Sequence, residues 1–189
     1  MTTRSCDRRA RGALAAAALL LGACAAGPPI DRVAGTSTRE ARLALELAHE
    51  RGPVRGRVQG RDAAPGRDVE ARILDVMADA VPALSVRFSP AAPEPSPALV
   101  VSHGLAAGAD PCAPGPPLTG DPLRVTAAFC DETGTLGAVR ATLASVDDEA
   151  RTRLYRRLAR ELFPDLYAER YGIRSGLPFN VYLGASFGL

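Results

Sequence analysis

The sequence has no lysine, few histidines and cysteines, and no apolar run long enough to cross a membrane. All 23 basic residues are arginine, and the chain holds two histidines and four cysteines. The apolar run between Gly12 and Gly22 is far shorter than the ~20 residues that span a bilayer. So few ligand residues make a poor zinc set, and we expect no metal and no cofactor.

The charge balance argues against a nucleic-acid partner. The whole chain has a formal charge of +2, but residues 1–23 contribute four arginines and one aspartate. Without them, 19 basic side chains stand against 20 acidic ones, so no positive field remains to attract a polyanion. No zinc-finger, homeodomain or RNA-binding signature is present. With 189 residues and an ordinary globular composition, one domain is expected.

The first residues have the pattern of an export signal. A positive segment at residues 4–11 precedes the short apolar run, which predicts a signal peptide over residues 1–23 rather than a transmembrane helix. The run ends in Leu21-Gly22-Ala23-Cys24. This sequence resembles the lipobox of bacterial lipoproteins, which has a large aliphatic residue, two small residues and an obligatory cysteine. The alternative is an ordinary secretory signal with a chance cysteine.

The lipobox resemblance implies a lipid anchor on Cys24. In that family the cysteine thiol receives a diacylglycerol, the preceding bond is cleaved, and the new amino group is usually acylated. Two or three chains anchor durably, whereas one holds weakly. Ala25 stands where an aspartate would retain the protein at the inner membrane, which favours the outer membrane. Residues 24–37 then read as a flexible tether, and residues 38–189 as one periplasmic domain.

The remaining cysteines predict a disulfide. Cys6 is lost with the signal peptide and Cys24 is the lipidation site, which leaves Cys112 and Cys130 as a pair in an oxidising compartment. A bridge that closes a loop of roughly twenty residues stabilises a domain by about 3 kcal/mol. The competing interpretation, a metal site, lacks the Cys-x-x-Cys spacing and sufficient histidines.

Apolar periodicity predicts three helices. The first spans residues 37–51 with a Ser37–Glu40 capping box, the second spans 68–81, and the third runs from a cap at Ser145 or Asp147 to Phe163. The residues expected to face the core are Leu43, Ala44, Leu47 and Ala48 in the first helix, Val69, Ile73, Val76, Met77 and Ala80 in the second, and Leu154, Leu158 and Leu162 in the third.

Alternating or continuous apolar residues predict the strands. They span residues 54–59, 84–88, 98–102 and 123–129, followed by 135–144 and, in the tail, 179–183. The turn Asp131-Glu132-Thr133-Gly134 predicts that the strands on either side of it form a hairpin. The fold class expected is α+β, a small antiparallel or mixed sheet with helices packed on one face.

The strand pattern supports a second, looser resemblance. Residues 98–104, then 123–144 with the Asp131–Gly134 turn between two strands, look like the pattern of the TolB amino-terminal domain and of the CsgG and LpoB lipoproteins. The resemblance covers less than half of the mature chain and contains no diagnostic residue. It implies a type of fold and transfers no functional residue.

No catalytic residue is identified. Gly184-Ala185-Ser186-Phe187-Gly188 has the spelling of a hydrolase nucleophile elbow but lacks the helix and the later histidine that the motif needs. His103 follows Ser102 at the end of a buried strand, where a histidine can act as a general base. With no orienting acid in view, a structural histidine is the simpler interpretation. His49, on a helix surface, is simpler still.

Two features are candidates for a partner surface. Arg153, Arg156, Arg157 and Arg160 crowd one helix together with Arg151, where they either meet lipid phosphates or an acidic partner, or form a solvated face. Seven of nine aromatic residues fall in the last thirty-five positions, Phe179 and Tyr182 among them. The tail strand either pairs with the domain's own sheet or offers an edge to a partner.

These features predict a non-enzymatic, membrane-anchored envelope lipoprotein that binds or helps assemble a cell-envelope complex. The expected partners are the membrane, reached through the lipid anchor, and another envelope protein. The alternative, from a different class, is a periplasmic hydrolase with an active site around His103 or around a carboxylate pair that the sequence does not locate.

Overall fold

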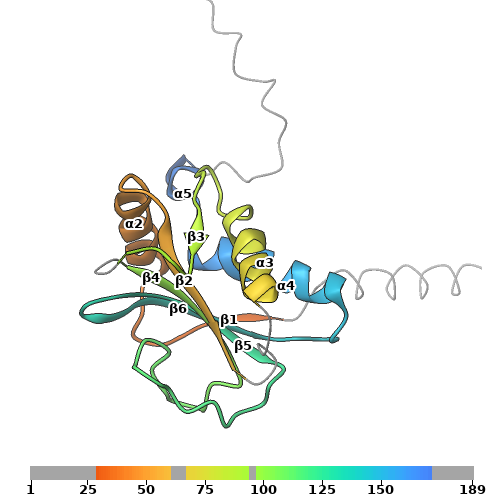
Figure 1. Ribbon diagram of the computed structural model, residues 1–189. Coiled ribbons are helices and arrows are strands. Elements are labelled where there is room, and N and C mark those ends of the chain that lie inside the picture. The colour runs from red at the N-terminus through yellow and green to blue at the C-terminus, as the bar shows by residue number, and fades with distance from the viewer. Residues whose placement is uncertain (1–28, 61–66, 94–96, 172–189) are drawn as a thin grey trace, which may run out of the picture.

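The computed structural model describes residues 29–60, 67–93 and 97–171, and it has the predicted α+β fold, built on one mixed sheet of six strands (Figure 1). The strand order is β1-β6-β5-β4-β2-β3. β2 runs parallel to β3 and β4, and the other neighbours are antiparallel. The strands are β1 (Ile30–Arg32), β2 (Val54–Gln59), β3 (Phe88–Ser89), β4 (Ala98–His103), β5 (Arg124–Asp131) and β6 (Gly134–Thr142).

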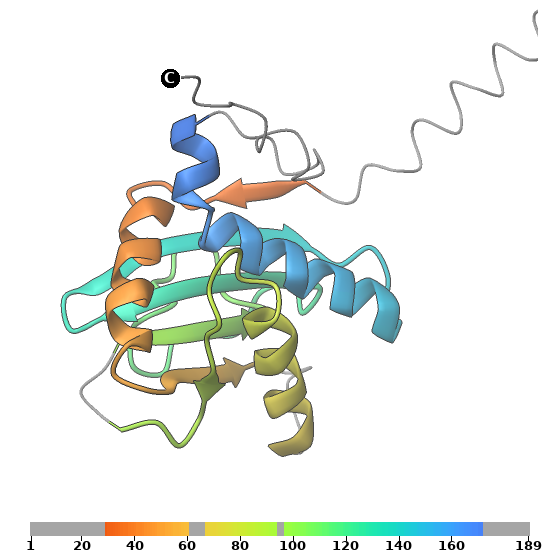
Figure 2. The ribbon, with the colours of Figure 1, turned by 90° about the horizontal axis from the view of Figure 1, so that it is seen from above.

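The helices cover one face of this sheet, as the sequence predicts. They are α2 (Thr38–His49), α3 (Arg67–Ala78), α4 (Asp148–Leu162) and the short α5 (Leu166–Tyr171). Seen from above, α2, α3 and α4 lie over the strands (Figure 2). The segment between β4 and β5 crosses the opposite face (Figure 1). No helix in the described part of the chain is long and apolar enough to span a membrane.

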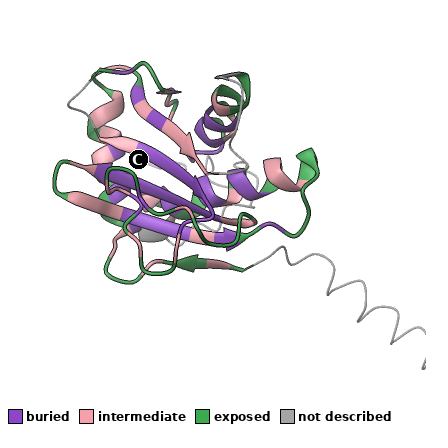
Figure 3. Ribbon diagram, turned by 60° about the horizontal axis from the view of Figure 1, so that its bottom comes forward, coloured by how far each residue is buried: buried purple, intermediate pink, exposed green. Residues whose placement is uncertain are grey.

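The period of two in the strands separates two apolar clusters. Alternate residues of the central strands face the helices and build the main core, while those between them face the β4–β5 segment. In Figure 3 the central strands are almost wholly buried, and the outer helix surfaces are exposed. The helix side holds Leu99, Val101, Val125, Ala127, Phe129 and Val139, and the other side holds Val100, Ala128, Cys130 and Ala138.

The β5–β6 hairpin turns where the sequence predicts it. The Asp131 carboxylate accepts hydrogen bonds from the Thr133 backbone N–H at 2.8 Å and from its hydroxyl at 2.7 Å. These bonds, the hydroxyl first, lower the pKa of Asp131 because they favour the charged carboxylate. Gly134 has a φ of +127°, which an L side chain rarely adopts.

Helix α4 also follows its prediction. Asp147 caps it by accepting the Ala150 N–H at 2.7 Å, and hydrogen bonds from Ser145 and this backbone N–H lower the pKa of Asp147. The predicted Leu154, Leu158 and Leu162 are all buried. The chain then leaves the helix through Phe163, whose ring meets Phe129 edge-on at 5.3 Å between centroids.

The buried face of α2 differs in part from the prediction: Ala44 and Ala48 pack against the core as expected, but Leu43 and Leu47 do not. Leu43 and Leu47 are 44% and 63% exposed, and Ala41 and Leu45 are buried in their place. Gly137 on β6 explains the choice, because a Cβ there would lie 2.7 Å from the Ala41 Cβ. The helix therefore approaches the sheet through its small residues.

An arginine also holds α2 in this position. The side chain of Arg42 is 3% exposed, and its guanidinium donates to the Pro82 carbonyl at 2.8 Å and to the Glu46 carboxylate at 2.7 Å. The Ser37 hydroxyl caps the helix by accepting the Glu40 N–H. The backbone N–H of Ser37 bonds to Leu136 of β6, so the cap is also an attachment to the sheet.

Helix α3 ends at Ala78, three residues before the predicted end at residue 81, and it also differs from its prediction at its first turn. Ile73, Met77 and Ala80 are buried, but Val69 is 46% exposed, because it lines an open groove rather than the core. Glu70 of the same helix accepts the Val58 backbone N–H at 2.9 Å. This contact occupies a donor on the side of β2 that β3 leaves uncovered.

Three further elements correct the sequence predictions. Part of the predicted tether, Ile30–Arg32, is an edge strand that pairs with residues 139–141 of β6. The strand expected over residues 84–88 is only the two residues Phe88–Ser89. Helix α5 is not predicted, since the last expected helix ends at Phe163. Residues 24–28, the tail strand 179–183 and the Gly184–Gly188 motif lie outside the described residues.

Candidate functional site

Ser102 and His103 point to opposite faces of the sheet because they are neighbours on β4. The Ser102 hydroxyl accepts a hydrogen bond from the Gln59 amide at 2.9 Å on the face that the β4–β5 segment covers. The His103 ring lies on the helix side, with Nε2 3.0 Å from the Tyr155 hydroxyl of α4. The pair therefore cannot act as nucleophile and base on one substrate.

His103 is held as part of the fold. It is 3% exposed, and its ring meets the Tyr155 ring edge-on at 6.2 Å between centroids. Gly60, at the end of β2, packs so closely against it that a Cβ would lie 2.3 Å from the His103 carbonyl oxygen. The positive φ of Gly60, +122°, lets the chain turn at this close approach.

A groove of about 240 Å³ opens above this histidine, between α3 and the first turns of α4. Each helix contributes positions spaced three and four apart, so a single face of each helix forms one wall. The wall from α3 is mainly aliphatic, and the wall from α4 is polar. The lining residues are Val69, Arg72, Ile73 and Val76 from α3, Asp148, Arg151, Thr152 and Tyr155 from α4, and His103 beneath them.

The groove has the chemistry of a binding site rather than of an acid–base centre. It offers an apolar wall, two guanidinium groups and two hydroxyl groups, which suit a small amphipathic ligand. Asp148 is the one carboxylate among its lining residues, so a paired-carboxylate mechanism has no second partner there. In the described part of the chain, no three His, Cys, Asp or Glu residues gather where they could hold a metal ion.

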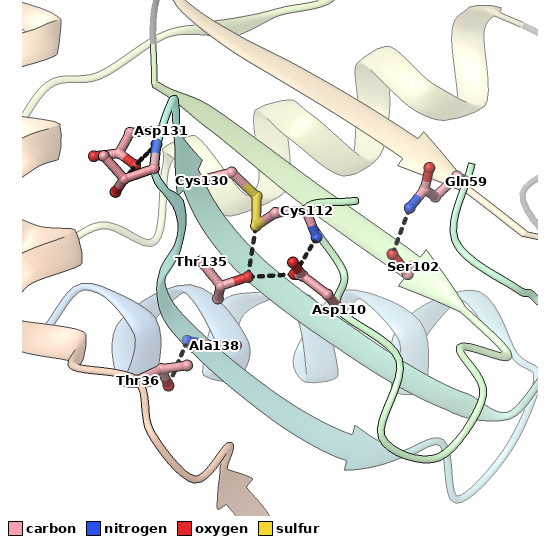
Figure 4. Close-up of a disulfide and its surroundings, with 10 residues drawn as sticks. Thr36, Gln59, Ser102, Asp110, Cys112, Cys130, Asp131, Thr135 and Ala138 are labelled. Atoms are coloured by element: carbon pink, nitrogen blue, oxygen red, sulfur yellow. Dashed lines mark hydrogen bonds between the residues drawn. A yellow bond between two sulfur atoms is a disulfide. The ribbon is translucent and has the colours of Figure 1, made fainter. Parts of the chain in front are cut away.

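The opposite face carries the disulfide that the sequence predicts. Cys112 and Cys130 are bonded, with their Cα atoms 5.7 Å apart, and the bridge joins the β4–β5 segment to strand β5 (Figure 4). The Thr135 hydroxyl of β6 lies 2.7 Å from the Asp110 carboxylate and 2.8 Å from the Cys112 sulfur. The bridge and these contacts fix the segment to two strands.

A row of polar side chains crosses the sheet on this face. Gln59 of β2 bonds to Ser102 of β4, and the Arg140 guanidinium of β6 donates to the Thr126 hydroxyl of β5 at 3.2 Å. Ser102 and Thr126 are fully buried. These two hydroxyls are paired within the row, which satisfies them, and because they are buried neither is presented to solvent.

The predicted arginine cluster forms one outward face of α4. Arg153, Arg156 and Arg160 are exposed, and Arg157 is half-buried beside them. Glu149 forms an ion pair with Arg153 one turn earlier. Of the other candidate partner residues, Phe179 and Tyr182 lie outside the described residues, as does the lipidation site Cys24.

The sequence identifies His103 and the arginine face but not the groove. Its α3 wall is visible in the sequence as Val69, Ile73 and Val76, which follow helical spacing and were assigned to the core. What the sequence does not reveal is how far apart the α3 and α4 faces stand. That separation depends on how both helices pack on the sheet.

Comparisons with known proteins give little. No protein-family model matches the chain, and no curated protein matches it. Among solved structures, a PelC dodecamer from Paraburkholderia phytofirmans matches with 11% sequence identity, over 72% of this chain and 94% of that one, at a TM-score of 0.33. A likeness of this extent carries no argument about function.

Proposed function

We propose that the protein is a lipid-anchored, non-enzymatic module of the bacterial cell envelope, which binds or helps assemble another envelope component. Its anchor is Cys24, and its domain faces the periplasm from the outer membrane. The lipobox-like Leu21-Gly22-Ala23-Cys24 and the alanine after it support this location.

The observation that carries the proposal is that two of the cysteines form a disulfide with each other, which leaves Cys24 for the lipid. Of the three cysteines that follow the signal peptide, Cys112 and Cys130 are bonded to each other. A disulfide between buried or half-buried cysteines is typical of exported proteins, since reducing compartments keep thiols free. Cys24 is then the remaining thiol, and it stands at the one position where the lipobox resemblance requires a cysteine.

The geometry of the sheet supports a binding role over the hydrolase alternative. The serine and histidine on which that alternative would draw are separated by the sheet, and the α3–α4 groove supplies only one carboxylate. The exposed features of the described residues, an amphipathic groove and an arginine face, are of kinds that bind.

The test compares Cys24→Ala with Cys6→Ala in cells fed labelled fatty acid. Cys24→Ala should lose the label and either remain at precursor size or become soluble, because the thiol is the acyl acceptor. Cys6→Ala removes the other cysteine of the same segment and should be labelled, cleaved and membrane-bound like the native chain. A Cys24→Ala protein of mature size that still partitions into detergent would refute the anchor.

A further inference from the structure

The arginine face of α4 is a regular stripe that points away from the core. Arg153, Arg156, Arg157 and Arg160 recur at spacings of three and four, opposite the leucines that bind the helix to the sheet. Arg153 is occupied by Glu149. Arg156 and Arg160 are exposed, and neither has a carboxylate within 4.0 Å among the described residues.

The chain leading from Cys24 enters the domain beside this helix. Ile30 pairs with Ala141 on the sheet edge, and two residues later the Arg32 guanidinium lies 4.0 Å from the Glu161 carboxylate of α4. Figure 2 shows β1 beside the carboxy-terminal end of α4. The described chain therefore begins beside the carboxy-terminal end of the helix that carries the arginine face.

The connection is also short. Cys24 precedes Ile30 by six residues, which span at most about 21 Å when fully extended. A folded unit of about 140 residues has a radius of gyration of roughly 14 Å and is therefore well over 30 Å across. Because the connection is shorter than the domain is wide, the β1 edge must stay close to whatever surface holds Cys24.

We propose that the arginine face of α4 docks on the anionic phospholipid surface in which Cys24 is anchored. The proposal rests on the lipid anchor proposed above and adds an orientation to it. Guanidinium groups match phosphate oxygens with paired hydrogen bonds, and a basic stripe next to a membrane tether is attracted by anionic head groups. Lipid phosphate is thus the partner that both the charge and the attachment point favour.

The test uses residues 24–189 with Cys24→Ser, which keeps every described residue and carries no lipid. Binding is measured by co-sedimentation, at low ionic strength, with vesicles of phosphatidylcholine containing phosphatidylglycerol and with phosphatidylcholine alone. R156E/R160E removes the two exposed charges. R51E/R87E is the matched control, because both arginines are exposed and precede β2 and β3, at the opposite edge of the sheet.

The native sequence should bind the phosphatidylglycerol vesicles only, and less as salt rises. R156E/R160E should bind roughly thirtyfold more weakly, since each arginine near an anionic surface contributes about fivefold, and R51E/R87E should bind as the native sequence does. Equal losses in both double variants would reduce the effect to net charge and overturn the proposal. Failure of the native sequence to bind either vesicle would also overturn it and turn attention to an acidic protein.

These outcomes do not depend on whether cells acylate Cys24, because the tested chain has no acyl group. Loss of label in the Cys24→Ala experiment and loss of vesicle binding in R156E/R160E are therefore separate results. Thermal unfolding followed by circular dichroism should give the same midpoint for both double variants, since all four substituted side chains are exposed.

Discussion

The disulfide should be a main source of stability, and removing it gives the sharpest test of the fold. Cys112 and Cys130 are 18 residues apart in sequence, and C112A/C130A frees the segment between them in the unfolded chain. For a closed loop of this length, the lost restriction amounts to about 3 kcal/mol of unfolding free energy on the chain-entropy estimate. In a domain of this size, that lowers the melting temperature by roughly 6–12 °C.

The assay is urea unfolding of the chain from Cys24, with Cys24→Ser, under non-reducing conditions. The double variant should lose about 3 kcal/mol, and its dependence on urea should steepen, because the unfolded chain without the bridge exposes more surface. The native bridge treated with a reductant should unfold like the double variant. As a control, thiol labelling of the protein before reduction should detect no reactive thiol, because Cys112 and Cys130 are bonded to each other.

Thr135→Val separates the bridge from the contacts around it. It removes the hydroxyl that lies against Asp110 and Cys112 but keeps the disulfide, and should cost about 1 kcal/mol. If C112A/C130A lost no more than Thr135→Val, the reasoning from chain entropy would be wrong. The bridge would then matter only for how the segment rests on the sheet.

Two other predictions follow from the described residues. Leu45→Ala should lower the unfolding free energy by about 2–5 kcal/mol because Leu45 is fully buried, whereas Leu47→Ala should change it by less than about 0.5 kcal/mol. Urea unfolding measures both, and the opposite ranking would contradict the observed face of α2. Because the pKa of Asp131 is lowered, its charged carboxylate stabilises the folded protein above the ordinary pKa of 3.8, and this contribution is lost as the pH falls through the lower folded value. Asp131→Asn should therefore lose less stability than the native protein between neutral pH and that acidic range. Parallel profiles of unfolding free energy against pH would contradict this role of the turn.

The sequence predicts the elements whose signals are local. The β5–β6 hairpin follows from its turn residues, and α4 follows from a cap, a leucine repeat and a terminating proline. The disulfide follows from counting cysteines when residues 1–23 are taken as an export signal. Each of these three predictions depends on residues close together in the chain or on the expected cell compartment, and none requires knowledge of the packing.

What the sequence does not predict depends on contacts between distant segments. Strand β1 is three residues long and forms because β6 offers an edge, and nothing in Ile30–Arg32 itself indicates a strand. The choice between two apolar stripes on α2 is made by Gly137, about a hundred residues away. The α3–α4 groove likewise follows from where two helices settle on the sheet.

The edge strand β1 would make the proposed lipid anchor extensible. A force applied to Cys24 would act through Ile30, on a strand that pairs with β6 at three residues. If these pairs open, together with the hydrogen bonds that Val33, Thr36 and Ser37 make to β6, the connection between Cys24 and the domain grows from six residues to the fourteen that separate Cys24 from Thr38. Its greatest reach then rises from about 21 Å to about 49 Å. The remaining sheet still has its other five strands and the helices that cover it. β1 is in this sense a segment that detaches under load, so that the connection to Cys24 lengthens before the rest of the domain has to unfold.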